Sequence, residues 1–212
     1  MLQALLDLVF PRACAGCGRG MEDPGYLCWD CLARTLWVRP PFCELCGDPF
    51  HGLVPQPAVC PRCAARLPAF DRARSAARFQ GVLREAVHAF KYGGATWLAA
   101  DLIRLAQPVF DEYFALANLD IVTYVPLFPA RERERGYNQA RLLARGLAAT
   151  RPGLALRACL RRIRPTPSQT RLTATERHAN VRAAFAARTR RGAINGRRIL
   201  LVDDVMTTGA TL

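Results

Sequence analysis

The 212-residue sequence has no long apolar run of the kind that spans a membrane, and we expect no secretory leader at its start. No apolar run approaches the roughly 18 residues of a membrane span. The opening stretch, "MLQALLDLVFPRAC", has Asp7 inside it, no basic region at its start and no small-residue cleavage site, which argues against a signal peptide. We favour an amphipathic helix there instead. Its apolar face would comprise Leu2, Leu5, Leu6 and Val9.

Lysine is nearly absent, with the single Lys91 set against 29 arginines. The net charge of +13 is unevenly placed, because residues 1–66 are neutral and the remainder holds 24 Lys+Arg against 11 Asp+Glu. Such a field attracts the phosphates of a small metabolite or of nucleic acid. The abundance of arginine and alanine is equally typical of a codon-composition bias, so the charge alone identifies no ligand.

Cysteine is abundant, and eight of the nine cysteines form four Cys-x-x-Cys pairs before residue 64. Gly18 and Gly47 follow the first and third pairs, so the segment is an internal repeat of two units. Two residues between cysteines let a tight turn direct both sulfurs at one ion, and two turns complete a tetrahedron. The repeat predicts two structural zinc sites, held by Cys14, Cys17, Cys28 and Cys31 and by Cys43, Cys46, Cys60 and Cys63.

Interleaved pairing of the cysteines and free or redox-active thiols are the alternatives to these two sites. Without a leader signal, the cysteines are expected as thiolates in a reducing cytoplasm rather than as disulfides. Cys159 stands alone and is interpreted as a small buried apolar residue. The three histidines have no evident ligand partners and are interpreted as surface or core residues. They are His51, His88 and His178.

Beyond the cysteine-rich segment, helix and strand patterns alternate. We therefore predict two domains, residues 1–66 with the helix and double zinc ribbon and residues 67–212 with an α/β fold. Strands are predicted at 75–80, 119–128, 154–160 and 198–204, with a basic loop at 161–182. Helices are predicted at 81–94, at 96–114 with an interruption at Pro108, and at 136–150. This alternation predicts a parallel sheet with ligands at the carboxyl ends of its strands.

The last strand leads into "DDVMTTGAT", a pattern with a clear chemical interpretation. Gly209 permits a sharp turn, and the amides and threonine hydroxyls of residues 207–211 can form a nest for one phosphate. Asp203 and Asp204 cannot face that phosphate, but they suit hydroxyl groups one sugar away or a magnesium ion. A phosphate flanked by a diol describes a 5-phosphoribosyl group.

This loop resembles the signature of type I phosphoribosyltransferases, which bind phosphoribosyl pyrophosphate (PRPP). In that superfamily the acids contact the ribose hydroxyls and the following turn takes the 5′-phosphate. The matching positions are Asp203, Asp204, Thr207, Thr208, Gly209, Ala210 and Thr211. Members continue past this loop with a helix and a strand, so we expect that the 212 residues lack the C-terminal end of the fold.

Further motifs resemble the competence protein ComF family, also called amidophosphoribosyltransferase-like, over nearly the whole chain. They occur in the family's order between the cysteine pairs and the terminal loop. They are Lys91 with Tyr92, "RGYNQA" at 135–140, and Gln169, Arg177 and Asn180 in a polar segment.

The resemblance implies roles for three of the basic residues. Arg135 and Gly136 would bind pyrophosphate, since arginine matches phosphate oxygens and glycine lets backbone amides approach. Lys91, Arg135 and Arg171 are the predicted catalytic residues, with Arg171 on a flap that closes over the leaving group. A solvated, salt-bridged helix is the competing interpretation of residues 131–135 and 176–181. For Lys91, the alternative is that a lysine occurs at this position by chance.

Two functions follow from the resemblance. The first is transfer of a phosphoribosyl group from PRPP, with magnesium and pyrophosphate release, to an acceptor that the sequence does not indicate. The second is a non-enzymatic, PRPP-gated module that binds single-stranded DNA during DNA uptake, although no regular aromatic platform is evident. A zinc ribbon with a degenerate transferase domain is disfavoured because the PRPP loop is intact.

Overall fold

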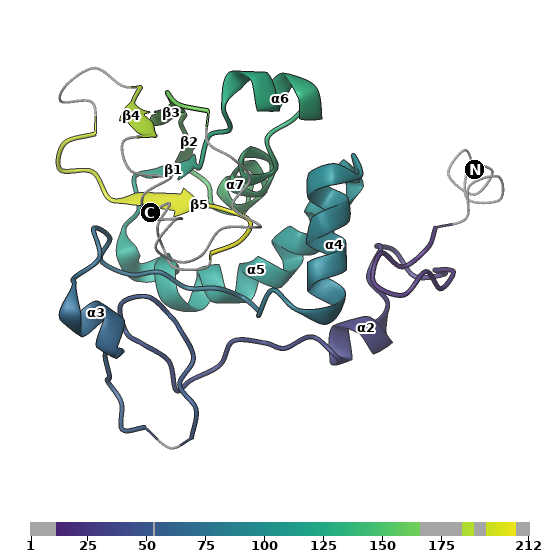
Figure 1. Cartoon of the computed structure of the whole chain (residues 1–212), viewed down its shortest axis with the longest axis horizontal. Helices are drawn as coiled ribbons and strands as arrows, with labels where there is room; N and C mark the ends of the chain where they lie inside the picture. Colours follow the sequence, from purple (N-terminus) through teal and green to yellow (C-terminus); the bar gives the residue numbers. More distant parts are fainter. Residues whose placement is uncertain (1–11, 53, 166–183, 189–193, 207–212) are drawn as a thin grey trace.

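The computed structural model describes residues 12–52, 54–165, 184–188 and 194–206 (Figure 1). Its helices are α2 (Trp29–Ala33), α3 (Pro61–Ala65), α4 (Gly81–Tyr92), α5 (Ala99–Phe114), α6 (Pro129–Arg135) and α7 (Gln139–Ala149), with the 3-10 turns η1 (Thr96–Leu98) and η2 (Ala115–Ala117). Its strands are β1 (Ile121–Tyr124), β2 (Ala155–Leu156), β3 (Leu160–Arg162), β4 (Phe185–Ala187) and β5 (Ile199–Val202). The helix expected near the N-terminus lies outside the described residues.

The centre of the fold is a parallel sheet with the strand order β2-β1-β5. Ile121 of β1 lies opposite Ala155 on one side and Ile199 on the other, and both pairings are parallel. The first three residues of β1 are buried, as expected of a central parallel strand with helices on the sheet. The mixed α/β architecture predicted from the alternating patterns is therefore confirmed. Parallel pairing also brings the carboxyl ends of β1 and β5 to one edge of the sheet.

Helices α5 and α7 pack against each other beside this sheet (Figure 1). Gly146 of α7 makes the close approach possible, because Ile103 of α5 fills the space that a Cβ atom would need. The core next to this contact contains the fully buried Phe90, Leu98 and Val122. Burial of such large apolar side chains is the main force that holds the layers together.

The predicted interruption of a helix at Pro108 is wrong, because α5 continues through this residue. Pro108 cannot donate to the carbonyl of Arg104, but both residues are exposed, so water can solvate the freed oxygen. The helix therefore tolerates the proline on its solvent side.

Two predicted strands also differ from the structure. Residues 75–80 form only one antiparallel bridge, between Ala77 and Trp37, because their partner is the short connector that follows α2 rather than the sheet. The strand predicted at 154–160 is β2 followed by a bend, since Cys159 donates its amide to the Thr123 hydroxyl instead of continuing the ladder (3.1 Å). The chain then enters β3, which pairs with β4 in a separate antiparallel ribbon.

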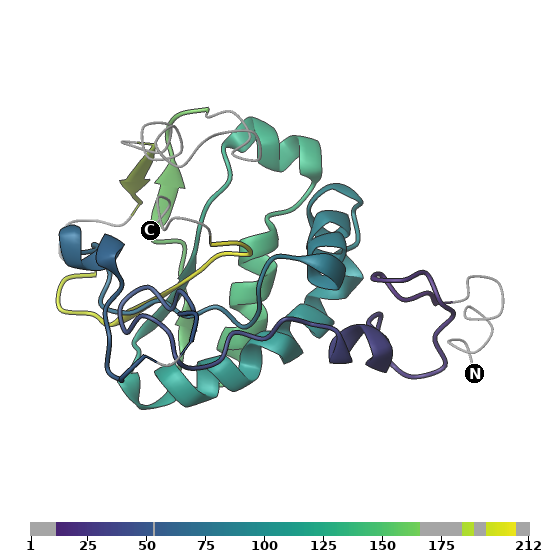
Figure 2. The same cartoon turned by 60° about the horizontal axis from the view of Figure 1, so that its bottom comes forward.

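The cysteine-rich segment contacts α5 near both of its ends, with α2 and α3 on opposite sides of the molecule (Figures 1 and 2). We call residues 12–35 the first ribbon and residues 41–66 the second ribbon. The Tyr26 ring of the first ribbon lies 4.0 Å from Trp97, and its amide donates to Asp101 (3.1 Å). The Phe42 ring of the second ribbon lies 5.7 Å from Tyr113.

The domain boundary between residues 66 and 67 stays a prediction. Among the residues that the structure describes, no helix has both the length and the apolar character required to cross a bilayer.

Candidate functional site

The structure brings the eight paired cysteines together in the two sets that the repeat predicts. Within each set the sulfur atoms all lie within 4.8 Å of one another. The Cys17 and Cys28 sulfurs are 3.8 Å apart, and those of Cys46 and Cys60 are 3.7 Å apart. Zinc–sulfur bonds of about 2.3 Å in a tetrahedron place the sulfurs about 3.8 Å apart. The sulfur–sulfur distances in both sets therefore fit tetrahedral coordination of one zinc ion.

The two ribbons build their sites in the same way. The first cysteine pair of each lies in a turn closed by a glycine with positive φ, 73° at Gly18 and 69° at Gly47. Each of these glycines donates its amide to the carbonyl of the first cysteine (2.8 Å in both turns). The second pair opens a short helix, with Cys28 before α2 and Cys60 before α3. This local geometry explains why glycine follows only the first pair of each unit.

In each set, the surroundings of one cysteine favour its thiolate form. Burial alone would raise the pKa of Cys14 and Cys43, but backbone amides that donate to their sulfurs outweigh it and lower the pKa of each to about 6. One such donor is the amide of Cys28, 3.3 Å from the Cys14 sulfur. Burial and neighbouring thiols instead raise the pKa of Cys31 and Cys63 to about 12. Zinc must therefore displace protons from these two cysteines when it binds.

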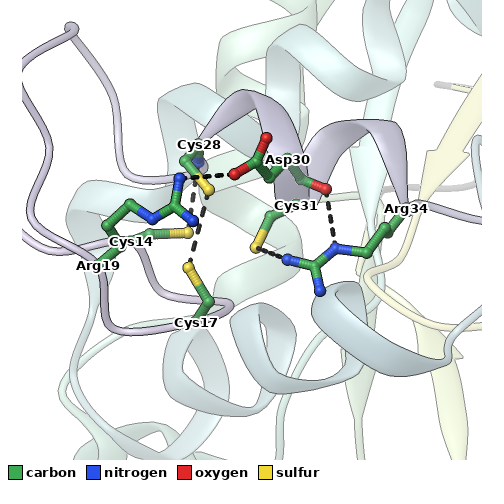
Figure 3. A network of polar contacts seen from close by, with 7 residues as sticks. All are labelled: Cys14, Cys17, Arg19, Cys28, Asp30, Cys31 and Arg34. Atoms are coloured by element: carbon green, nitrogen blue, oxygen red, sulfur yellow. Dashed lines mark hydrogen bonds and ion pairs between the residues drawn. The ribbon is translucent and has the colours of Figure 1, made fainter.

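Arginines support the negative charge that four thiolates around one zinc ion would carry. Arg34 donates to the carbonyl of Asp30 (3.0 Å) and directs a second nitrogen at the Cys31 sulfur (3.9 Å; Figure 3). In the second ribbon, Arg62 lies 3.4 Å from the Cys46 sulfur. Both sets are closed by four protein ligands, which is typical of structural rather than catalytic zinc.

A second polar site lies at the carboxyl end of β5, where Asp203 and Asp204 follow the strand directly. Asp204 pairs with Lys91 at 2.8 Å, and the side chains of these two residues are only 4% and 19% exposed. Within the described part of the chain, the second carboxylate oxygen of Asp204 is buried without a hydrogen-bond partner. A buried acceptor of this kind carries a free-energy penalty that a ligand donor or a cation would remove.

Asp203 is the second acid of this site. Burial, followed by repulsion from Asp204, raises the pKa of Asp203 to about 8. Asp203 is therefore mostly protonated at neutral pH. Two adjacent carboxyls, one of them buried and paired with Lys91, are well suited to a diol or to a divalent ion.

The turn between α6 and α7 lies at the same edge of the sheet. Gly136 ends α6 with φ of 82°, and the space beside its α-carbon is open. Asn138 then caps α7 by accepting from the amide of Arg141 (3.1 Å), and its side-chain amide donates to the carbonyl of Val125 after β1 (3.1 Å). The asparagine thus fixes the turn to the end of the central strand.

Two sequence motifs that are distant in the chain form one unit around Lys91. Tyr137 donates its hydroxyl to the carbonyl of Phe90, and the Arg135 guanidinium lies 5.1 Å from the Tyr92 ring centre. Arg135 is further oriented by donation to the Gln139 side chain. The Arg-Gly-Tyr-Asn-Gln turn therefore contacts the backbone before Lys91 and the ring after it.

Arg162 is a residue near the acids that sequence reasoning missed. Burial lowers its pKa, and the negative charge of Asp203 opposes that shift. Its guanidinium also lies 5.4 Å from the Phe185 ring centre across the β3–β4 ribbon. Arg161 and Arg162 were predicted to begin the basic loop, but in the structure they continue from Leu160 as strand β3.

Several predicted site residues cannot be placed. Thr207, Thr208, Gly209, Ala210, Thr211 and Arg171 lie outside the described residues, as do Gln169, Arg177 and Asn180. For Arg131 the solvated-helix interpretation agrees with the structure, because this residue forms an exposed ion pair with Glu134 (3.1 Å).

Comparisons with known proteins cover both parts of the chain. Residues 5–64 match the family model of the double zinc ribbon domain. The DNA utilization protein YhgH of Salmonella typhi is 31% identical, over 89% of this chain and 88% of its own length. Competence protein ComFC of Bacillus subtilis is 30% identical, over 88% of this chain and 74% of its own length. Competence protein F of Haemophilus influenzae is 29% identical, over 81% of this chain and 75% of its own length. No solved structure matched the chain significantly.

Proposed function

This chain belongs to the ComF family of competence and DNA utilization proteins, and from that premise we propose that it binds PRPP with magnesium and transfers the phosphoribosyl group to an acceptor. The observation that carries the proposal is the buried Asp204 carboxylate, held by Lys91 through one oxygen and without a partner, among the described residues, at the other. Asp204 comes shortly before residues 207–211, whose sequence is suited to a phosphate nest.

Binding would use the acids for the sugar and the α6–α7 turn for the pyrophosphate. The Asp203 and Asp204 carboxyls would accept hydrogen bonds from the two ribose hydroxyls. Gly136 leaves space for backbone amides to approach phosphate oxygens, and Arg135 supplies a forked donor. The turn at residues 207–211 would take the 5′-phosphate. Magnesium, when bound, would neutralise pyrophosphate oxygens, and Asp203 and Asp204 are the residues that would hold it.

The reaction would break the bond between the anomeric carbon and pyrophosphate as a bond from the acceptor forms. Negative charge then grows on the leaving pyrophosphate, so a cation that is already positioned lowers the barrier. Lys91 is such a cation because the end of α4 and Asp204 hold its ammonium group in place. Arg135, whose guanidinium lies beside the Tyr92 ring, would add a second positive charge, and Arg171 a third from the flap.

Phosphorus NMR tests the proposal directly. We expect free pyrophosphate to accumulate when the protein is mixed with magnesium, PRPP and a pool of nucleobases and cell extract. Asp204→Asn should abolish this accumulation of pyrophosphate without changing the zinc content. Asp111→Asn, which alters an exposed acid of α5, serves as the matched control. Broadened PRPP signals without turnover would show binding without catalysis, and unchanged signals would overturn the assignment of the loop.

A second function, binding of single-stranded DNA in DNA uptake, is favoured by the names of the relatives and by the net charge of +13. We propose that such binding would occur in the cytoplasm, where reduced cysteines can hold zinc. Its signature would be an oligonucleotide affinity that falls steeply with salt and persists in Asp204→Asn. A salt-independent affinity, or none, would exclude this function.

A further inference from the structure

The second zinc site packs against the loop that follows the paired acids. The four cysteines of the second ribbon form a buried cluster of their own. The partly buried apolar residues packed against it are Leu45, Phe50, Phe70 and Met206. Three of these belong to the ribbon or directly follow it, but Met206 comes from the other end of the chain. It is separated from Asp204 by a single residue.

Consecutive side chains of this loop contact different parts of the molecule. Asp204 pairs with Lys91 of α4, Val205 packs against the main α/β core, and Met206 packs against the second ribbon. The turn that carries the acids is therefore held between the α/β core and the second ribbon.

The second ribbon is itself anchored firmly enough to act as a support. Arg74, whose side chain is only 2% exposed, pairs with the Glu44 carboxylate (3.3 Å) and donates to its carbonyl (2.9 Å). The same guanidinium lies 4.6 Å from the Phe42 ring centre and 5.0 Å from that of Tyr113 on α5. The amide of Ala73 adds a hydrogen bond to the second ribbon. These contacts fix the ribbon relative to the sheet.

We expect the arrangement of the second ribbon around its four sulfurs to depend on the metal. The buried members of its cluster are the four cysteines alone, so no separate apolar core within that cluster would keep the sulfurs together without zinc. The first ribbon differs, because Cys14 and Cys31 belong to the main core together with Leu83 and Val87 of α4. Loss of zinc should therefore alter the surface under Met206 more than it alters the first ribbon.

We propose that the second zinc ribbon holds the Asp203–Met206 turn in its ligand-binding conformation through Met206. Zinc at the second site, and not at the first, then sets the affinity for magnesium–PRPP. This inference rests on the proposed function. In it Met206 is a positioning residue, since it touches the ribbon and acts on the ligand through Asp203 and Asp204.

Calorimetric titration with magnesium–PRPP tests the role of Met206 in the full chain. We expect Met206→Ala to raise the dissociation constant at least about fivefold, the lower range of typical coupling between sites. Met206→Leu, which conserves apolar volume, should stay within about twofold of wild type. Met21→Ala is the matched control, because it removes the same side chain from the first ribbon and should leave affinity unchanged.

The reciprocal measurement uses zinc itself. Coupling between two binding sites is mutual, so saturating magnesium–PRPP must raise the zinc affinity of the second site by the same factor. Competition with a zinc-selective chelator should therefore show protection of one of the two ions in wild type and of neither in Met206→Ala. Cys17→Ser weakens the first site alone and would identify the protected ion as that of the second ribbon.

The outcomes separate this inference from the function on which it rests. If wild type does not bind magnesium–PRPP, the proposed function fails and the inference fails with it. If wild type binds but Met206→Ala and Met21→Ala are equal to it, the inference alone is overturned. If Met206→Ala does not fold, zinc protection in wild type and the affinity of Met206→Leu decide, and absence of protection overturns the inference.

Discussion

Replacement of Lys91 by methionine should expose how strongly the acid pair depends on one cation. The change keeps the length and the apolar stem of the side chain but removes its charge. Asp204 is only 4% exposed, so its carboxylate would be left buried and, among the residues that the structure describes, without a paired cation. Removal of one partner from a buried pair typically costs about 3–5 kcal/mol. Because Lys91 is 19% exposed and water can partly replace it, we expect about 3 kcal/mol.

Urea unfolding at neutral pH, with both zinc sites loaded, measures this cost. The matched control is Arg131→Met, which breaks the exposed pair with Glu134 and should cost less than about 1 kcal/mol. Asp204→Asn in the Lys91→Met background should recover much of the loss, because no buried charge then remains unpaired. Equal costs for Lys91→Met and Arg131→Met would refute the buried ion pair.

Three other measurements follow from the structure. The pKa of Asp203, raised to about 8 by burial, means that folding binds a proton, so the free energy of unfolding should fall as pH rises from about 4 to 8 and Asp203→Asn should lose this slope. The high pKa of Cys31 and Cys63 means that zinc displaces protons, so zinc affinity in chelator competition should rise from pH 6 to pH 8. Tyr137→Phe removes the hydrogen bond to the Phe90 carbonyl and should cost about 1 kcal/mol in urea unfolding, whereas no change would contradict that contact.

The zinc sites could be predicted from the sequence because their geometry is local. A spacing of two residues and a following glycine, such as Gly18, determine how each cysteine pair turns, and the repeat indicates which pairs belong together. The parallel sheet was predictable for a related reason, since its strands are apolar runs between amphipathic helices. Both signals lie within a few residues of the features they describe.

The partners of Lys91 could not be predicted in this way. Its pairing with Asp204 joins residues more than one hundred positions apart and depends on the position of β5 beside β1. The contact of Met206 with the second ribbon has no sequence signal either, because a methionine in a loop suits many surroundings. Pro108 shows the opposite error. The proline is a strong local signal for a break in the helix, but α5 continues because the carbonyl it leaves unpaired is exposed to water.

The register of the sheet has a consequence for the order in which the protein folds. Ile121 pairs with Ile199 across a long stretch of sequence, whereas the cysteines of each ribbon close short loops. Short loops form quickly, and long-range parallel pairing is slow. On a ribosome, both ribbons can emerge and capture zinc before β5 is synthesised. The paired acids would then arrive at a surface on which Lys91 and the second ribbon are already in place.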